Sequence, residues 1–207
     1  MLIGFHLLKQ IPDGKECWIL SCENLFRFTI VNQAKSKLSK MPSFATKLAG
    51  IADIPIVIEI QKKTWEPTYR EILTKEQIEY MFDRLYSFEA LENSISVGHH
   101  QFLLLFSERQ PVGFASVSEE RPKYFKLHKI YVLPSSQGTG AGKYLIGEVE
   151  KYVLSQGGEK LSLNVNRFNK AKTFYEKMNF NVIRQEDIPI GPYWMNDYVL
   201  EKQLIKS

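Results

Sequence analysis

The sequence predicts an α+β fold, in which helices and strands follow one another along a single main domain. Two regions carry this prediction. Apolar residues repeat at helical spacing between residues 54 and 87, whereas three strand-like apolar runs lie within residues 101–133. The chain has 207 residues, of which 44% are apolar and 13% aromatic, and this is enough to bury the core of one domain, with or without an extension.

The first 41 residues differ from the remainder and are expected to form an N-terminal extension. They contain a turn signal at Pro12-Asp13-Gly14, two short apolar runs and the basic stretch NQAKSKLSK, which leads to Met41. The predicted division is therefore an extension at 1–41 and a main domain at 42–207. One hypothesis is that Met41 is the true start of the protein and that the upstream piece is dispensable.

Residues 43–96 predict one strand followed by helices. The segment SFATKLA has the pattern of a strand, and a helix is expected to begin near Asp53 because residues 54, 57, 58 and 60 are apolar. The segment TWEPTYREIL (64–73) is expected to connect this helix to the next. LTKEQIEYMFDRLYS predicts the second helix, with Thr74 as its cap and a glutamine three residues later. A short helical piece around LENSI follows.

The remaining residues predict six strands, of which three precede and three follow a long helix. Strand signals QFLLLF, PVGFASVS and YFKLHKIYVL occupy 101–106, 111–118 and 124–133. A helix is predicted from Lys143 to Leu154, ending at the stop signal Gly157-Gly158. After it, KLSLNVN, NKAKTFYEKM, FNVIRQ and YWMNDYVLEKQL predict a strand, a helix and two further strands.

Charge and cysteine content exclude several classes of function. Residues 1–41 carry six Lys/Arg and three Asp/Glu, whereas residues 42–207 carry 21 and 20, so the main body is nearly neutral and does not predict nucleic-acid binding. No run of about 18 apolar residues and no signal-peptide pattern is present, which predicts a cytoplasmic protein without a membrane partner. Cys17 and Cys22, spaced C-x4-C, predict free thiols and no metal site.

The stretch PSSQGTGAGKYL (134–145) places three glycines at alternate positions between a strand-like run and an amphipathic run. A dinucleotide fingerprint would need glycine where Lys143 or Leu145 stands, and a P-loop would need glycine at Gln137 and Ser or Thr at Tyr144. Glycines let backbone N–H groups approach a ligand, and a helix N-terminus favours anions, so a diphosphate fits this turn. A turn with only a structural role is the alternative.

Two motifs in register resemble those of the GNAT superfamily of N-acetyltransferases. The first is Gln137-x-x-Gly140-x-Gly142 after YVLP, which has the spacing of the family's acetyl-CoA signature Q/R-x-x-G-x-G/A. The second is SLNVNRFNKAKTFYEKMNF. The resemblance as a whole covers about residues 43–205, with helices and strands in the order found in the family. The positions that match the second motif are Leu163, Val165, Asn169, Ala171, Phe174, Tyr175, Lys177, Asn179 and Phe180.

The resemblance implies a three-layer fold with a mixed, splayed β-sheet flanked by helices, and acetyl-CoA as acetyl donor between the fourth and fifth strands. Backbone groups of Ile130, Tyr131 and Val132 would pair with its pantetheine arm. Asn169 would contact the cofactor as well as cap a helix, and Tyr175 would donate a proton to the departing thiolate. The diphosphate would lie on Gln137, Gly138, Thr139, Gly140, Ala141, Gly142 and Lys143.

The resemblance also implies an enzyme that transfers the acetyl group to a primary amine by direct attack in a ternary complex. The overall pattern looks most like a bacterial branch that includes polyamine N-acetyltransferases, so a small-molecule amine is the expected acceptor. Trp65, Glu66 and Tyr69 are expected to contact it through cation–π and charge interactions. Protein or peptide amines, and a noncatalytic acyl-CoA-binding regulatory module, are the alternatives. A homodimer is left open.

The base that deprotonates the amine is not assigned by the sequence. The predicted fourth strand has no acidic residue and offers Lys126, His128 and Lys129 instead. Further candidate bases near strand ends are Glu119, Glu120, His99 and His100, with a solvated turn or a loop as the alternative reading. Near the last hairpin, Trp194, Asn196 and Asp197 are expected to border the acceptor pocket.

Overall fold

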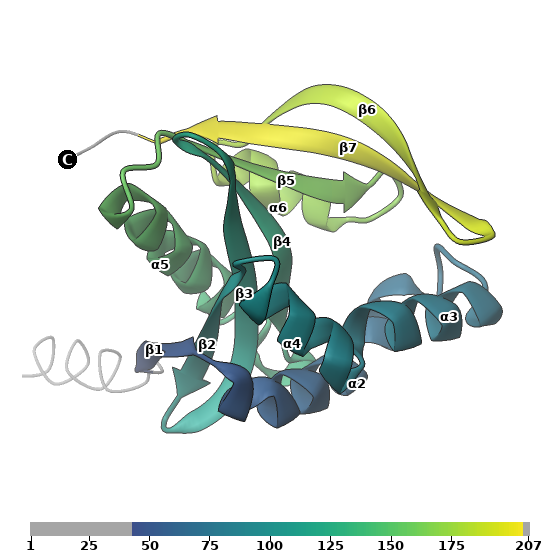
Figure 1. The fold of residues 1–207 in the computed structure, drawn as a ribbon, viewed down its shortest axis with the longest axis horizontal. Coiled ribbons are helices and arrows are strands. Elements are labelled where there is room, and N and C mark those ends of the chain that lie inside the picture. The colour runs from purple at the N-terminus through teal and green to yellow at the C-terminus, as the bar shows by residue number, and fades with distance from the viewer. Residues whose placement is uncertain (1–42, 205–207) are drawn as a thin grey trace, which may run out of the picture. The chain divides into compact units, whose positions relative to one another are not determined.

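A computed structural model describes residues 43–204 of the chain, and Figure 1 shows the arrangement of its helices and strands. The predicted extension at 1–41, with both cysteines, lies outside the described residues. The strands are β1 (Phe44–Ala49), β2 (Gln101–Ser107), β3 (Gln110–Arg121), β4 (Tyr124–Val132), β5 (Lys160–Asn166), β6 (Asn181–Ile190) and β7 (Tyr193–Gln203). The helices are α2 (Ile54–Tyr69), α3 (Lys75–Tyr86), α4 (Phe88–Ser96), α5 (Ala141–Ser155) and α6 (Ala171–Lys177).

The seven strands form one mixed sheet in the order β1-β2-β3-β4-β5-β7-β6. Within residues 43–204, β4 and β5 are the parallel pair and all other neighbours are antiparallel. The parallel pairing covers four positions and stops at Leu127↔Leu163. Beyond this point β4 and β5 diverge, as Figure 1 shows, so the sheet is splayed in its centre. The predicted fold class, a mixed splayed sheet flanked by helices, is confirmed.

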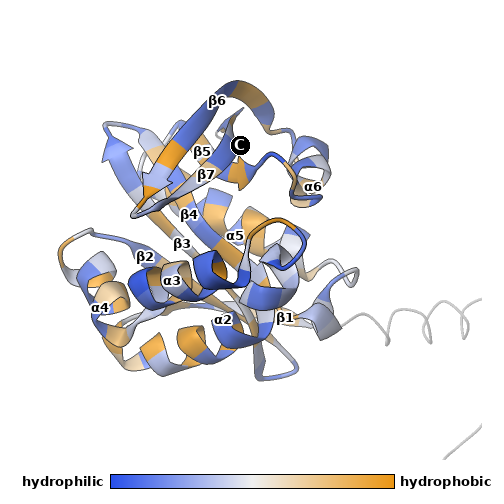
Figure 2. Ribbon diagram, turned by 90° about the vertical axis from the view of Figure 1, so that its right-hand side faces the viewer, coloured by the Kyte–Doolittle hydropathy of each residue, from blue (hydrophilic) through white to orange (hydrophobic). Residues whose placement is uncertain are grey.

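Two apolar layers cover the two faces of the sheet, because successive side chains of a strand point to opposite faces. Leu103 and Leu105 of β2 pack with α5, whereas Phe102 and Leu104 pack with α2, α3 and α4. The α5 positions expected to face the core are all buried, namely Leu145, Ile146, Val149 and Val153. In Figure 2, apolar and polar segments alternate along these helices, as expected for helices with one face on a sheet.

Local capping fixes where the first helices begin. The backbone N–H of Gln77 donates to the Thr74 hydroxyl at 3.2 Å, which confirms Thr74 as the cap of α3. The Asp53 carboxylate accepts from the backbone N–H of Gly50 at 3.1 Å and from Lys47 at 2.9 Å, directly before α2. Predicted and observed elements agree in type and order along the described residues.

One boundary differs from the prediction in a way that affects the site. The segment 64–73 was expected to connect two helices, but α2 continues through Pro67 to Tyr69. Proline lacks an N–H and normally disrupts a helix interior. Here the hydroxyl of Thr68 donates to the carbonyl of Thr64 at 2.6 Å and supports the turn around Pro67. The residues of this segment therefore alternate between faces with the period of a helix.

None of the helices described between residues 43 and 204 combines the length and apolar character needed to cross a membrane.

Candidate active site

A cleft of about 860 Å³ opens where β4 and β5 diverge. Its walls come from the second half of β4, the second half of β5, the C-terminal end of α2, the glycine-rich turn before α5, and α6. Tyr69, Ile130, Tyr131, Val132, Gln137, Gly138, Gly140, Gly142, Lys143, Asn169 and Tyr175 all line it. The fold thus brings together most of the candidate residues from four separate parts of the sequence.

Beyond Leu127, one edge of β4 faces this cleft and has no strand partner among residues 43–204. On the other edge, Ile130, Tyr131 and Val132 pair with β3 at Ala115, Phe114 and Gly113. The register with β5 stops at Leu127. Backbone N–H and C=O groups at such an edge are available to an extended ligand that carries amides, which would add to the sheet as a strand does.

The glycine-rich turn has backbone conformations that favour glycine. Gly138 and Gly140 have φ values of 75° and 94°, in the left-handed region where other residues are strained. Gly140 directly precedes α5, and no side chain among the described residues caps the helix at this position. The first N–H groups of a 15-residue helix are therefore available to an anion in the cleft.

Other residues of the turn contact the protein itself. The side-chain amide of Gln137 donates to the carbonyl of Val132 at 3.0 Å, and the hydroxyl of Thr139 donates to the carbonyl of Ser136 at 2.7 Å. Ala141 is buried and, like Thr139, is not among the residues that line the cleft. A Cβ at Gly142 would lie 3.3 Å from the Phe174 ring, so this glycine allows close packing against α6.

Helix α6 carries the residues of the second motif. The carboxamide oxygen of Asn169 accepts from the backbone N–H of Ala171 at 2.9 Å and so caps the first turn, while its side chain also borders the cleft. Tyr175 is 8% exposed, packs against Phe174 and Phe180 and lines the cleft. Burial raises the pKa of the Tyr175 phenol above its usual value, so the hydroxyl is protonated at neutral pH.

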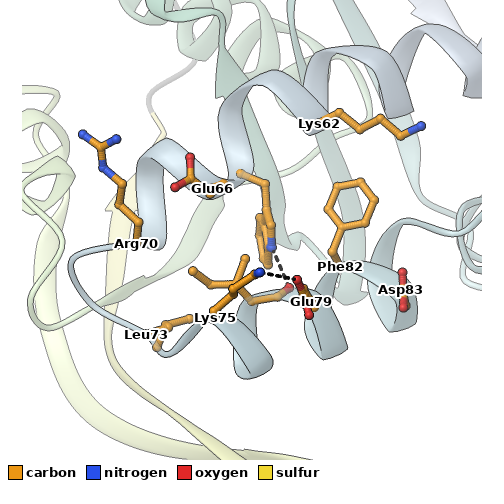
Figure 3. Close-up of a pocket in the computed structure, with 10 residues that line it drawn as sticks. Lys62, Glu66, Arg70, Leu73, Lys75, Glu79, Phe82 and Asp83 are labelled. Atoms are coloured by element: carbon orange, nitrogen blue, oxygen red, sulfur yellow. Dashed lines mark hydrogen bonds and ion pairs between the residues drawn. The ribbon is translucent and has the colours of Figure 1, made fainter.

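The acceptor residues suggested by the sequence lie close together on α2 but in different surroundings. Tyr69 lines the cleft, and its hydroxyl lies 3.4 Å from that of Tyr131. Trp65 is 4% exposed, and its indole N–H donates to the carbonyl of Ile78 at 3.0 Å, so it packs in the core behind Tyr69. Glu66 borders a second cavity of about 580 Å³ between α2 and α3, shown in Figure 3.

Helical periodicity identifies cleft residues on α2 that were not singled out from the sequence. Positions three or four apart share a helix face, and Thr64, Pro67 and Thr68 line the cleft from α2. Glu71 and Ile72 continue the same wall after the helix ends. A helix that continues through Pro67 places Thr64, Pro67 and Thr68 on one face, and the sequence pattern did not predict that continuation.

Two histidines form a stack beside the cleft. His100 and His128 have ring centroids 4.0 Å apart, and their ring nitrogens hydrogen-bond to Ser116 and Ser118 at 3.1 and 2.8 Å. Burial, together with nearby positive charge, lowers the pKa of His100 to about 4 and that of His128 to about 2. Both are neutral at physiological pH, and His128 lines the cleft as a very weak base.

The other candidate bases lie near the ends of strands. Glu120 lies 3.2 Å from His128, whereas Glu119 accepts from the backbone N–H of Lys123 at the strand end. Of the residues expected to border the pocket near the last hairpin, Trp194 is 56% exposed. Asp197 is 5% exposed and lies on β7 opposite Asn166, which lines the cleft.

Comparison with known proteins places this arrangement in a family. Residues 69–191 match the family model described as "Acetyltransferase (GNAT) domain". The chain is 28% identical over 166 residues to the spermidine N(1)-acetyltransferase of Thermoplasma acidophilum, covering 78% of this chain and 98% of the relative. The crystal structure of the PaiA N-acetyltransferase of the same organism in complex with coenzyme A superposes with a TM-score of 0.67, at 28% identity and with 78% and 99% of the two chains covered.

Two further relatives match over shorter stretches. An N-acetyltransferase of Mycobacterium tuberculosis, Rv2669, is 32% identical over 95 residues, which are 45% of this chain and 61% of the relative's length. The [ribosomal protein bS18]-alanine N-acetyltransferase of Haemophilus influenzae is 36% identical over 84 residues, 39% of this chain and 55% of the relative. The family model spans more than half of the chain and includes most of the residues that line the cleft, so the chain belongs to the GNAT acetyltransferase family.

Proposed function

We propose that this protein is an acetyl-CoA-dependent N-acetyltransferase that acetylates a primary amine of a small molecule, such as a polyamine, by direct attack in a ternary complex. One observation carries the proposal. A single cleft contains an unpaired strand edge, a helix N-terminus with glycines at positive φ, and a buried, protonated tyrosine. These are the groups needed to hold an amide-containing diphosphate ester and to protonate a leaving sulfur.

The donor side of the cleft is assigned to β4 and the turn before α5. The free edge at Ile130, Tyr131 and Val132 would bind the pantetheine amides, and the N–H groups from Gly138 to Lys143 would bind the diphosphate. Gln137 and Thr139 hold the turn in shape through their bonds to backbone carbonyls. The T. acidophilum relative was crystallised in complex with coenzyme A, which supports coenzyme A as the group that carries the acetyl donor.

Acetyl-CoA supplies an activated thioester. The protein must hold the acceptor amine near it, release the amine as a neutral nucleophile and protonate the departing thiolate. We assign Tyr175 as the proton donor, since it lines the same cleft as the free edge of β4 and comes from α6. Its burial keeps the proton on the phenol until a strongly basic atom appears beside it.

The acceptor side of the cleft is assigned to the end of α2. Tyr69 and Tyr131 present aromatic rings and hydroxyl groups, and Glu71 adds a carboxylate, a combination that suits a cationic amine. The spermidine N(1)-acetyltransferase relative supports a polyamine acceptor. A terminal amine of a protein is the second candidate, and the H. influenzae relative that acts on a ribosomal protein alanine favours it.

A thiol-release assay with acetyl-CoA tests the proposal. Spermidine, spermine, other small amines and a peptide with an N-terminal alanine serve as acceptors, and we expect turnover with at least one small amine. Turnover with the peptide alone would select the protein-acetylating alternative. Tight acetyl-CoA binding without turnover on any acceptor would contradict an enzyme and favour a noncatalytic acyl-CoA-binding module.

Tyr175→Phe tests the assigned proton donor. Because the phenyl ring keeps the packing against Phe174 and Phe180, we expect kcat to fall by about 10²–10⁴-fold while the Kd for acetyl-CoA stays nearly constant. Tyr152→Phe on α5, whose side chain does not line the cleft, is the matched control and should keep wild-type kcat. Wild-type kcat in Tyr175→Phe would remove this tyrosine from the role.

A further inference from the structure

A buried carboxylate lies on β7 behind the acceptor side of the cleft. Asp197 is directly opposite Asn166 of β5, and Asn164 of β5 lies opposite Val199. Directly opposed residues of an antiparallel pair share a face of the sheet. Asn164 and Asn166 both line the cleft, so Asp197 lies on the cleft-lining face, next to the point where β4 and β5 diverge.

The neighbours of Asp197 along β7 identify which face this is. Met195, two residues before it, packs in the core under α2 and α3. Tyr198 belongs to the opposite face, where the ammonium of Lys172 from α6 lies 5.4 Å from its ring. The charge of Asp197 also acts on Tyr69, whose pKa it raises. Asp197 is therefore on the side of the sheet assigned to the acceptor.

One oxygen of the Asp197 carboxylate has no hydrogen bond. Asp197 is 5% exposed, and its Oδ1 has no partner of hydrogen-bond geometry within residues 43–204. The Nδ2 of Asn164 is likewise buried without a hydrogen bond of good geometry among the described residues, although the Asn164 amide is close enough to lower the pKa of Asp197. An unsatisfied buried carboxylate oxygen destabilises a fold, and a chemical role is one explanation for it.

The surroundings of Asp197 act on the pKa of its carboxyl group in opposite directions. The pKa of Asp197 is raised to about 6, mainly by burial, and the Glu186 carboxylate on the neighbouring strand contributes in the same direction. The Asn164 amide, Lys126 and Arg167 act in the opposite direction, and Arg167 is itself paired with Asp187. At pH 7.5 the carboxylate is ionised and remains a stronger base than an ordinary aspartate.

We propose that Asp197 accepts the proton of the acceptor ammonium before the amine attacks, an assignment that rests on the proposed acetyltransferase function. An N–H bond of the ammonium breaks, its electron pair stays on nitrogen, and the proton moves to the carboxylate directly or through one water molecule. The neutral amine forms the C–N bond to the thioester carbonyl. Tyr175 protonates the departing sulfur, and the second amine proton restores Tyr175. Asp197 returns its proton to solvent.

The other titratable side chains of the cleft serve this role less well. His128 lines the cleft, but its pKa of about 2 makes it a poorer proton acceptor than Asp197. Lys129 also lines the cleft, and burial lowers its pKa to about 8, so it is mostly cationic at neutral pH. Its ammonium lies 5.0 Å from the ring of Tyr86, which stabilises the charged form.

The pH dependence of kcat/KM in Asp197→Asn tests this assignment, with an amine that the wild-type protein acetylates. The wild type should lose activity below about pH 6 as one group becomes protonated. In Asp197→Asn we expect kcat/KM at pH 7.5 to fall by about 10²-fold or more and the acidic limb to disappear, with an unchanged Kd for acetyl-CoA. Asp197→Glu should retain part of the activity and an acidic limb. Asp83→Asn, on α3 beside the second cavity, is the control and should keep the wild-type profile.

The outcomes separate this inference from the proposed function. Wild-type turnover together with a wild-type profile in Asp197→Asn would overturn the role of Asp197 and leave the acetyltransferase intact. A limb near pH 8 that disappears in Lys129→Met would assign the base to Lys129 instead. Absence of turnover in the wild type with every acceptor would overturn both. Thermal unfolding of each variant, measured at every pH used, confirms that it is folded.

Discussion

The stacked histidines predict a loss of stability on mild acidification. The folded protein keeps His128 neutral, because burial and the neighbouring His100, Lys126 and Lys129 lower its pKa to about 2 from an ordinary 6.5. Folding therefore excludes a proton that the unfolded chain binds below about pH 6.5. The stability associated with His128 is complete above that pH and is lost progressively as the pH falls toward the folded pKa.

The size of the effect follows from the pH interval. At pH 5 the solution is about 1.5 units below the unfolded pKa and well above the folded one, and each unit corresponds to about 1.4 kcal/mol. His128 should therefore lower the free energy of unfolding by about 2 kcal/mol between pH 7.5 and pH 5. Its side chain is 19% exposed, so solvent screening reduces this value only moderately. Asp197, with its raised pKa, acts in the opposite direction over the same interval.

Urea unfolding of the wild type and of His128→Asn at several pH values isolates the histidine. The difference between the two proteins removes the contribution of titratable groups that do not contact His128, whereas a change in the stacked His100 forms part of the measured effect. We expect His128→Asn to differ from the wild type by an amount that changes by about 2 kcal/mol from pH 7.5 to pH 5. His99→Asn is the control, since His99 is exposed and has a φ of 51° that asparagine tolerates. A pH-independent difference would refute the buried neutral state of His128.

Two further predictions concern the turn and a helix cap. Gly140→Val should weaken acetyl-CoA binding by about tenfold or more in calorimetry, because a β-branched residue is strained at φ 94° and the N–H groups of the turn would shift. Gly147→Ala is the control, since its added Cβ would meet no atom within 4 Å outside its own helix backbone and chain neighbours among the described residues. Unaltered affinity in Gly140→Val would contradict the diphosphate assignment. Thr74→Ala should lower the free energy of unfolding by about 1 kcal/mol in urea titration through loss of the bond to the Gln77 N–H, whereas Thr74→Ser should retain it.

The sequence by itself determined the elements and the donor side of the site. The order of helices and strands depends on local periodicity and capping, which is why the predicted α+β order and the Thr74 cap agree with the structure. The glycines before α5 and the motif that carries Asn169 and Tyr175 are contiguous in the chain. Local sequence therefore indicated an anion-binding turn and a tyrosine within the same domain.

Only the tertiary structure decided how the acceptor side is built. Trp65 and Tyr69 share a face of α2 and their rings are 4.5 Å apart, but tertiary packing buries Trp65 against α3, whereas Tyr69 lies one turn further along and reaches the cleft. Asp197 is separated from Tyr69 by more than a hundred residues, and only the register of β5 with β7 brings it behind the cleft. Sheet register and burial depend on contacts between distant segments, and local sequence patterns do not encode them.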